Sequence, residues 1–256
     1  LKGDTQRQIA AMWTYLKEID KQDLPEKIKQ ARSQDYEMVP KNRPLILRTF
    51  MDKAGMHAIA VGFPQRVHFA FDAENVRPAQ AWRGRFLDAQ GTWFERFAPP
   101  ADPLGDALVS LPPGVPLAML KDNQQAWPSG DAEQAGYRFS GYRLDASGIP
   151  TFLYRVGPFE VEDRIVPGAE KSLQRQLKIK NRKPGTKSTL LWLRANTGKT
   201  LQQKSATTTR IKNGLTVTIP KEFSRRGELR QSKKITEWII PLTVETETTI
   251  EVQYTW

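Results

Sequence analysis

The two histidines of this 256-residue chain stand near carboxylates in the sequence. A histidine and a carboxylate in hydrogen-bond contact can act as an acid–base pair or as metal ligands. His68 and Asp72, four apart, would stand roughly 13 Å apart along a strand, so they meet only where the strand turns. Ordinary packing or a surface position is the competing interpretation for both histidines. The candidate catalytic residues, under the interpretation that the protein is an enzyme, are His57, His68, Asp72 and Glu74.

A second group of residues combines indoles with guanidinium groups. An indole can stack on a sugar ring, and guanidinium forks bind carboxylate or sulfate groups. In the segment AWRGRF, a strand would place Arg83 and Arg85 on one face and Trp82 and Phe86 on the other. The alternative is that the aromatic residues belong to the core and the arginines pair with nearby acids. The candidate ligand-binding residues are Arg77, Trp82, Arg83, Arg85 and Trp93.

The net charge of +11 is concentrated in one region. Between Lys171 and Lys234 there are 18 Lys and Arg residues but only two acids, Glu222 and Glu228, so that the rest of the chain has a net charge of −5. Clustered cations suit an anionic glycan, an acidic protein partner or nucleic acid. Nucleic acid is the least favoured, because no helix-turn-helix, zinc-finger or RNA-recognition pattern is present. Lysines that keep strand faces soluble are the competing interpretation.

Other chemistry is restricted by composition. The chain contains no cysteine, which excludes disulfides, thiolate metal sites and the C-x-x-C-H attachment of covalent haem. The motifs G-x-S-x-G and H-E-x-x-H are absent too. A glycosidase-type carboxylate pair would have Glu160, Glu162 and Asp163 as candidates, against a surface strand end as the alternative.

Hydrophobic patterning predicts a helix followed by a β-rich domain. Apolar residues recur at helical spacing over residues 4–20, and Thr5 with Gln8 forms a capping-box pattern. The next segment is polar and interrupted by prolines, and after residue 44 the pattern alternates with period two. We therefore expect a helical tail of a preceding domain at 1–22, a linker at 23–43 and a β-sandwich domain at 44–256. The proline-rich stretch 98–136 is typical of a binding loop.

The predicted fold class is all-β: an antiparallel β-sandwich with an N-terminal helix. Many strands with regular turn signals and no alternating helices favour this class over a βαβ fold. An extended sandwich like the galactose-mutarotase supersandwich is one form it could take. No window of the sequence is apolar enough for a transmembrane span, and the N-terminus lacks the layout of a signal peptide.

Several segments carry a resemblance to a known family. They are RTFMDKAGMHAIAVGFP, FAFDAENVRPAQAWRGRFLDAQGTW, GYRFSGYRLDASGIPTFLYRVG and the terminal VQYTW. They resemble the region that follows the cytochrome c domain in large secreted haem-binding proteins of the planctomycete type. The resemblance covers most of residues 44–165 and, more loosely, the remainder. QIAAMWTYLKEID is similar to the C-terminal helix that closes a small cytochrome c.

The resemblance implies an exported protein, periplasmic or secreted, from a redox or polysaccharide-degrading setting. It implies a covalent haem only in an upstream cytochrome c domain, with no cofactor in this chain, and it supplies no catalytic residues. Our principal hypothesis is a non-catalytic binding or docking module for an anionic polysaccharide or an acidic redox partner. A sugar-acting enzyme, mutarotase- or lyase-like, with a His/carboxylate pair is the first alternative. Nucleic-acid binding through the basic C-terminal half is the second.

Overall fold

A computed structural model describes the β-rich part of the chain. The described residues are 37–88, 100–129, 132–133, 136–183, 190–212, 214–224, 227–232 and 234–256. They belong to the second of two compact units, Glu37–Trp256. The helix expected at 1–22, the first part of the expected linker and Trp93 lie outside the described residues.

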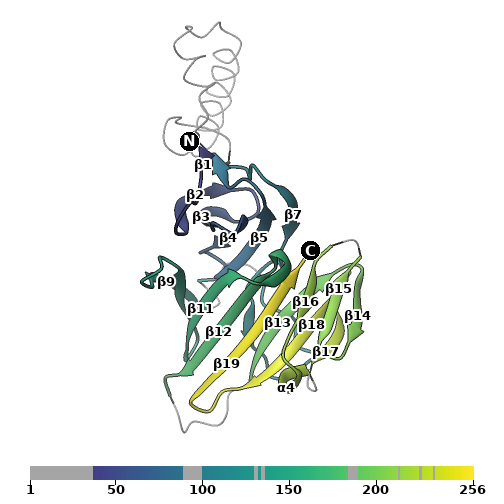
Figure 1. The fold of residues 1–256 in the computed structure, drawn as a ribbon. Coiled ribbons are helices and arrows are strands. Elements are labelled where there is room, and N and C mark those ends of the chain that lie inside the picture. The colour runs from purple at the N-terminus through teal and green to yellow at the C-terminus, as the bar shows by residue number, and fades with distance from the viewer. Residues whose placement is uncertain are drawn as a thin grey trace, which may run out of the picture. The chain divides into compact units, whose positions relative to one another are not determined.

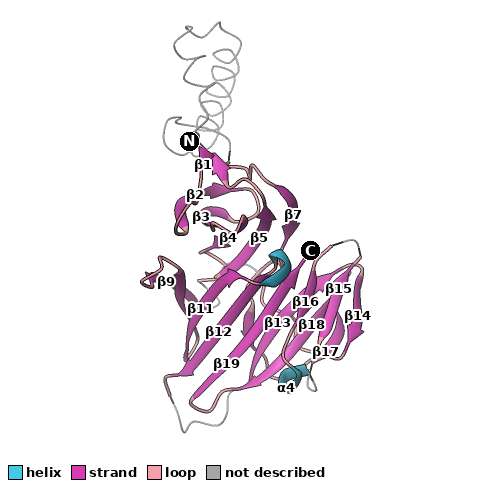
Figure 2. Ribbon diagram, viewed as in Figure 1, coloured by secondary structure: helices cyan, strands magenta, loops and turns pink. Residues whose placement is uncertain are grey.

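Strands dominate the described residues, and all of their pairings are antiparallel (Figures 1 and 2). The largest sheet has eight strands, in the order β14 (Leu201–Ser205), β15 (Thr208–Ile211), β16 (Thr216–Thr218), β19 (Glu247–Thr255), β12 (Leu173–Asn181), β11 (Phe159–Pro167), β10 (Pro150–Val156) and β9 (Tyr137–Leu144). A four-stranded sheet has the order β17 (Glu228–Ser232), β18 (Ile235–Thr243), β13 (Leu190–Gly198) and β8 (Leu117–Met119). A five-stranded sheet has the order β2 (Leu45–Met51), β3 (Gly55–Gly62), β4 (Val67–Asp72), β5 (Arg77–Arg83) and β7 (Asp106–Ser110).

The remaining elements are short. Strands β1 (Glu37–Met38) and β6 (Leu87–Asp88) pair with each other. The helical segments are η1 (Ala169–Lys171) and α4 (Lys221–Ser224). No helix in the described part of the chain is long and apolar enough to cross a membrane.

One large apolar core joins the three main sheets. It contains Phe71 from the five-stranded sheet, Phe152 from the eight-stranded sheet and Trp238 from the four-stranded sheet. The rings of Phe71 and Phe152 are stacked, with centroids 3.9 Å apart. Burial of each such side chain contributes about 1.5–3 kcal/mol. The predicted all-β antiparallel sandwich is therefore confirmed.

The five-stranded sheet is buried on both of its faces in the middle. Its second face carries a separate apolar cluster that includes Leu47, Met51, Trp82, Phe86 and Leu87. Every residue of β4 is consequently buried, although its sequence VHFAFD alternates between apolar and polar types. The alternation predicted a strand correctly, but it did not indicate that the polar face is covered too.

The C-terminal strand follows its sequence pattern closely. Ile250, Val252 and Tyr254 are buried, while the residues between them face outward. β15 and β16 pair as neighbouring strands, and the amide of Gly214 between them donates to the carbonyl of Ile211 at 3.0 Å. In Figure 1 the long strands β11, β12 and β19 lie side by side in the eight-stranded sheet.

Candidate functional site

His68 is a buried structural residue. Its imidazole is 1% exposed, with Nδ1 accepting a hydrogen bond from the Phe63 amide at 3.1 Å and Nε2 within 3.0 Å of the Gly84 carbonyl. These contacts fit a neutral ring with the proton on Nε2. Burial lowers the pKa of His68, with Arg66 contributing in the same direction. Both nitrogens are occupied by the backbone, so His68 has no ring nitrogen free for acid–base work.

Asp72 and Arg77 organise the turn between β4 and β5. The Asp72 carboxylate accepts hydrogen bonds from the amides of Glu74 and Asn75 and lies 3.3 Å from Nε of Arg77. Arg77 also donates to the carbonyls of Lys53 and Pro112. The pair is nearly buried, and it connects the turn to two other segments of the chain.

Trp82 does not form a stacking surface. Its side chain is fully buried against Phe86, with stacked rings 5.9 Å apart, and its Nε1–H donates to the carbonyls of Arg85 and Phe86. The alternative that these aromatic residues belong to the core therefore describes the structure. Trp93, the other predicted indole, lies outside the described residues.

Arg83 and Arg85 are engaged separately. Arg83 donates to the carbonyls of Lys171 and Trp256 and lies over the Trp256 ring at 4.6 Å. Arg85 forms an ion pair with Glu37 at 2.6 Å. The predicted constellation of arginines and indoles is thus divided among different contacts, and its described members do not converge on one surface.

The pairing of His68 with Asp72 considered from the sequence does not form, because backbone groups occupy both ring nitrogens of His68, but His57 lies near a carboxylate. Nδ1 of His57 lies 3.8 Å from Oε2 of Glu74, and both side chains are more than half exposed. Both residues line a cavity of about 690 Å³. The cavity lies beside β2, β3 and β9 and the turn after β4. Sequence analysis missed the two arginines that line it, Arg48 and Arg138, because pairing of β2 with β3 and the placement of β9 bring them to the histidine.

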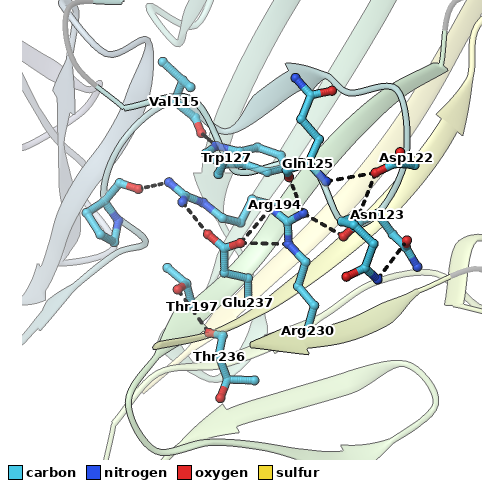
Figure 3. Close-up of polar contacts among 12 residues, drawn as sticks. Val115, Asp122, Asn123, Gln125, Trp127, Arg194, Thr197, Arg230, Thr236 and Glu237 are labelled. Atoms are coloured by element: carbon cyan, nitrogen blue, oxygen red, sulfur yellow. Dashed lines mark hydrogen bonds and ion pairs between the residues drawn. The ribbon is translucent and has the colours of Figure 1, made fainter. Parts of the chain in front are cut away.

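A buried ionic network fixes the irregular segment before β9 to the four-stranded sheet (Figure 3). Glu237 is 1% exposed and binds Arg194 at 2.9 Å and Arg230 at 2.8 Å. Both guanidinium groups lie near the Trp127 ring, at 4.9 and 5.9 Å. Arg194 also donates to the carbonyl of Pro113. These charged contacts hold this part of the proline-rich stretch against the sheet, whereas the sequence suggested a binding loop.

The three acids of β11 have different environments. Asp163 is fully buried and forms a two-pronged ion pair with Arg175, at 2.9 and 2.6 Å, while Tyr154 donates to the same carboxylate. Glu160 and Glu162 point outward and pair with surface arginines, Glu162 with Arg143 at 2.6 Å. Strand alternation separates Asp163 from its neighbours, so the three do not share a glycosidase-type site.

Ion pairs cover one half of the outer face of the eight-stranded sheet, which we call the ladder half: the outward residues of β9, β10, β11, β12 and β19. Its pairs are Arg143–Glu162, Arg155–Glu160, Arg182–Glu160, Arg164–Asp145 and Lys178–Glu247. The lysines of β12 that contribute to the sequence's basic region face acids of β11 and β19 in register. Lys178 pairs with Glu247 at 3.2 Å, and Lys180 has Glu160 and Glu247 beside it on the neighbouring strands.

The other half of the face carries cations without acids. Residues 199–221 contain no Asp or Glu, and the outward side chains of β14, β15 and β16 are Thr, Gln, Lys and Arg. Four exposed cations belong to these strands and the adjoining turns, namely Lys199, Lys204, Arg210 and Lys212. We add a fifth, Lys234, from the turn between β17 and β18. None of the five forms an ion pair with another described residue. We call this surface the cationic turn face.

The turns of this face come together because of strand pairing. Leu201 pairs with Ile211, which brings the turns containing Lys199 and Lys212 to the same end of the sheet. Gly198 pairs with Thr236, which places the turn containing Lys234 beside that of Lys199. The acid of β19 nearest to this face is Glu251, which is exposed. It lies two residues beyond Gln253, the residue that pairs with Thr218 of β16.

Among the described residues, no group of three or more metal-ligating side chains is close enough to hold a metal ion. Comparison of the chain with family models, with curated proteins and with solved structures found no match.

Proposed function

We propose that this protein is a non-catalytic binding module that docks onto an anionic glycan through the cationic turn face. The observation that carries the proposal is the set of five exposed cations, four of which belong to residues 199–221, a segment that contains no acid. Cations that lack intramolecular partners keep their full attraction for an external polyanion, and the release of counterions favours its binding.

The chemistry between the cations fits a polysaccharide. Thr208 and Thr218 are hydrogen-bonded neighbours at 3.2 Å on this face, and Gln202 lies beside Lys204. Hydroxyl and amide groups both donate and accept hydrogen bonds, as sugar hydroxyls do. A sheet surface with several such groups can bind an extended chain through many weak contacts.

The same surface is less suited to nucleic acid. Single strands bind through aromatic side chains that stack on bases. The large apolar side chains exposed among the described residues include none from β14, β15 or β16. Reading of duplex DNA requires an element that enters a groove. The described surface offers flat strands and short turns instead.

The family resemblance suggests a setting for the module. In an exported protein with an upstream cytochrome c domain, periplasmic or secreted, it would hold the haem domain near an anionic polysaccharide. An acidic redox partner is the other occupant this setting allows. Covalent haem and electron transfer would belong to the upstream domain, because this chain has no cysteine to attach haem.

The experiment compares two fourfold variants that lose the same charge. The first variant combines Lys199→Gln, Lys204→Gln, Arg210→Gln and Lys212→Gln. It should bind heparin and polygalacturonate at least 100-fold more weakly at low salt, because four contacts with sulfate or carboxylate groups are lost. The control carries Arg143→Gln, Arg155→Gln, Lys178→Gln and Arg182→Gln in the ladder half and should bind nearly as tightly as the parent chain. Binding is measured by titration calorimetry at several salt concentrations.

Equal losses in the two variants would mean that net charge alone, and not this face, attracts the glycan. Tighter binding to duplex DNA than to either glycan would favour the nucleic-acid alternative. If the chain bound an acidic redox protein but neither glycan, the partner of this face would be an acidic protein and the glycan proposal would be wrong.

The His57–Glu74 pair supports a second candidate, a sugar-acting enzyme. Of the four candidate catalytic residues it is the only histidine–carboxylate contact, and it lies at a cavity. At 3.8 Å the two atoms are beyond ordinary hydrogen-bond distance, so the pair would have to tighten on binding substrate. Mutarotase or lyase activity that is lost in both His57→Asn and Glu74→Gln would establish this candidate.

A further inference from the structure

The cavity beside β2, β3 and β9 is a continuation of the space between two sheets. Its inner wall includes Ile59 and Ala73, which are 2% and 8% exposed and belong to the main core. The strand face that carries Val61 and Ile59 continues outward to His57. The core therefore opens at this edge into a hollow with an apolar interior.

The mouth of the cavity exposes apolar side chains to solvent. Met56 is 81% exposed and Phe50 is 36% exposed, and both line the cavity. Large apolar residues at the rim of a hollow mark ligand-binding sites, because a ligand removes them from water. The volume of about 690 Å³ is within the range that holds a small molecule.

Two guanidinium groups line the same cavity. Arg48 lies 5.9 Å from the centre of the Tyr142 ring, and Arg138 comes from the edge strand β9. Neither forms an ion pair with another described residue. Glu74, which contacts His57, and Glu133 bring two negative charges to the lining. This balance disfavours polyanions such as nucleotide phosphates, while a single carboxylate matches the excess of unpaired arginines in the lining.

We propose that this cavity binds a small monocarboxylate that carries an aromatic ring. The ring would contact Ile59, Phe50 and Phe139, and the carboxylate would bind Arg48 and Arg138. Hydrogen bonds between a guanidinium group and a carboxylate fix the orientation of such a ligand. The site shares no residue with the cationic turn face, so it is independent of the docking function proposed above.

The test measures binding of 3-phenylpropionate by titration calorimetry and by saturation-transfer NMR. Three further compounds serve as probes. Benzyl alcohol lacks the carboxylate, phenylalanine adds an ammonium group, and galacturonate has a sugar ring in place of the aromatic ring. The aromatic carboxylate should bind at least 10-fold more tightly than benzyl alcohol and galacturonate, because each of these lacks one half of the recognition. Phenylalanine should bind more weakly than 3-phenylpropionate, because its ammonium group lies next to the carboxylate and therefore close to the two arginines.

Substitution then locates the site. Arg48→Gln and Arg138→Gln should each weaken 3-phenylpropionate binding by about 10-fold or more. The control is Arg143→Gln, also on β9, whose guanidinium pairs with Glu162 outside the cavity. Phe50→Ala should weaken binding and change the NMR contacts of the ring protons. Absence of binding by the parent chain, or equal losses in the Arg143 control, would overturn the proposal.

Discussion

Lys180 and Arg210 occupy equivalent positions in two halves of one sheet, yet their surroundings are opposite. Lys180 in β12 lies between Glu160 of β11 and Glu247 of β19. Arg210 in β15 lies between Gln202 of β14 and Thr216 of β16. Each residue contributes one positive charge to the basic region Lys171–Lys234. Only pairing with distant strands decides that one cation has acids on both neighbouring strands and that the other has none.

The two faces of the sheet also differ within the ladder half, where ion pairs lie both on the outer face and in the core. Glu162 and Asp163 are neighbours on β11, but Glu162 faces water and Asp163 faces the core. Paired charges in water contribute little to stability, whereas removing one partner of a buried pair leaves an uncompensated charge in an apolar environment. The outer pairs therefore set surface potential, while the inner pair determines whether the sheet packs.

The largest expected effect is the loss of the buried carboxylate. Asp163→Asn should lower the free energy of unfolding by about 3–5 kcal/mol, because the Arg175 guanidinium loses its ion-pair partner in the core. Glu162→Gln, the control one residue away, should change it by less than about 1 kcal/mol. Urea denaturation followed by tryptophan fluorescence measures both values. Similar losses in the two variants would contradict the distinction between the inner and outer pairs.

Transplanted acids should abolish the difference between the two halves. Gln202→Glu with Thr216→Glu places carboxylates on both sides of Arg210, as Glu160 and Glu247 flank Lys180. Heparin affinity should fall by about 10-fold, which corresponds to about 1.4 kcal/mol. The reverse change, Glu160→Gln with Glu247→Gln, should strengthen heparin binding, because it removes acids from the ladder half.

A control for this transplant adds the same charge elsewhere. Gln176→Glu with Thr249→Glu introduces two acids within the ladder half. Its heparin affinity should change by less than about 3-fold if the glycan contacts the cationic turn face. An equal loss in the two double variants would mean that the partner senses total charge.

Mild acid should affect the interior before it affects either half of the outer face. Burial holds the pKa of His68 below 6.5, so below that pH the unfolded chain binds more protons than the folded chain. Stability should therefore fall by up to about 1 kcal/mol between pH 6.5 and 5.5. Arg164 and backbone amides lower the pKa of Asp145, so the Arg164–Asp145 pair stays charged through this range.

Urea denaturation at the two pH values measures the effect. His68→Asn should remove the pH dependence, and His57→Asn, a substitution of the exposed histidine, should retain it. A fall of the same size in the His68 variant would assign the acid sensitivity to other groups.

Much of the fold could be predicted from the sequence because strand alternation is a local property. The alternation of Ile250, Val252 and Tyr254 corresponds to an observed strand with one buried face. The candidate site was predicted less well. Trp82 and His68 were identified as possible functional residues, but the separate apolar cluster on the second face of the five-stranded sheet buries both. That second layer has no local sequence signal.

The sequence by itself determined that the chain forms antiparallel strands, that it contains no cysteine chemistry and that its positive charge is concentrated after residue 170. The tertiary structure alone decided which cations meet acids, which histidine contacts a carboxylate and where the core opens into a cavity. The physical reason is that periodicity depends on residues a few positions apart. Charge compensation, burial and cavities depend on side chains that strand pairing and sheet packing bring together from distant positions.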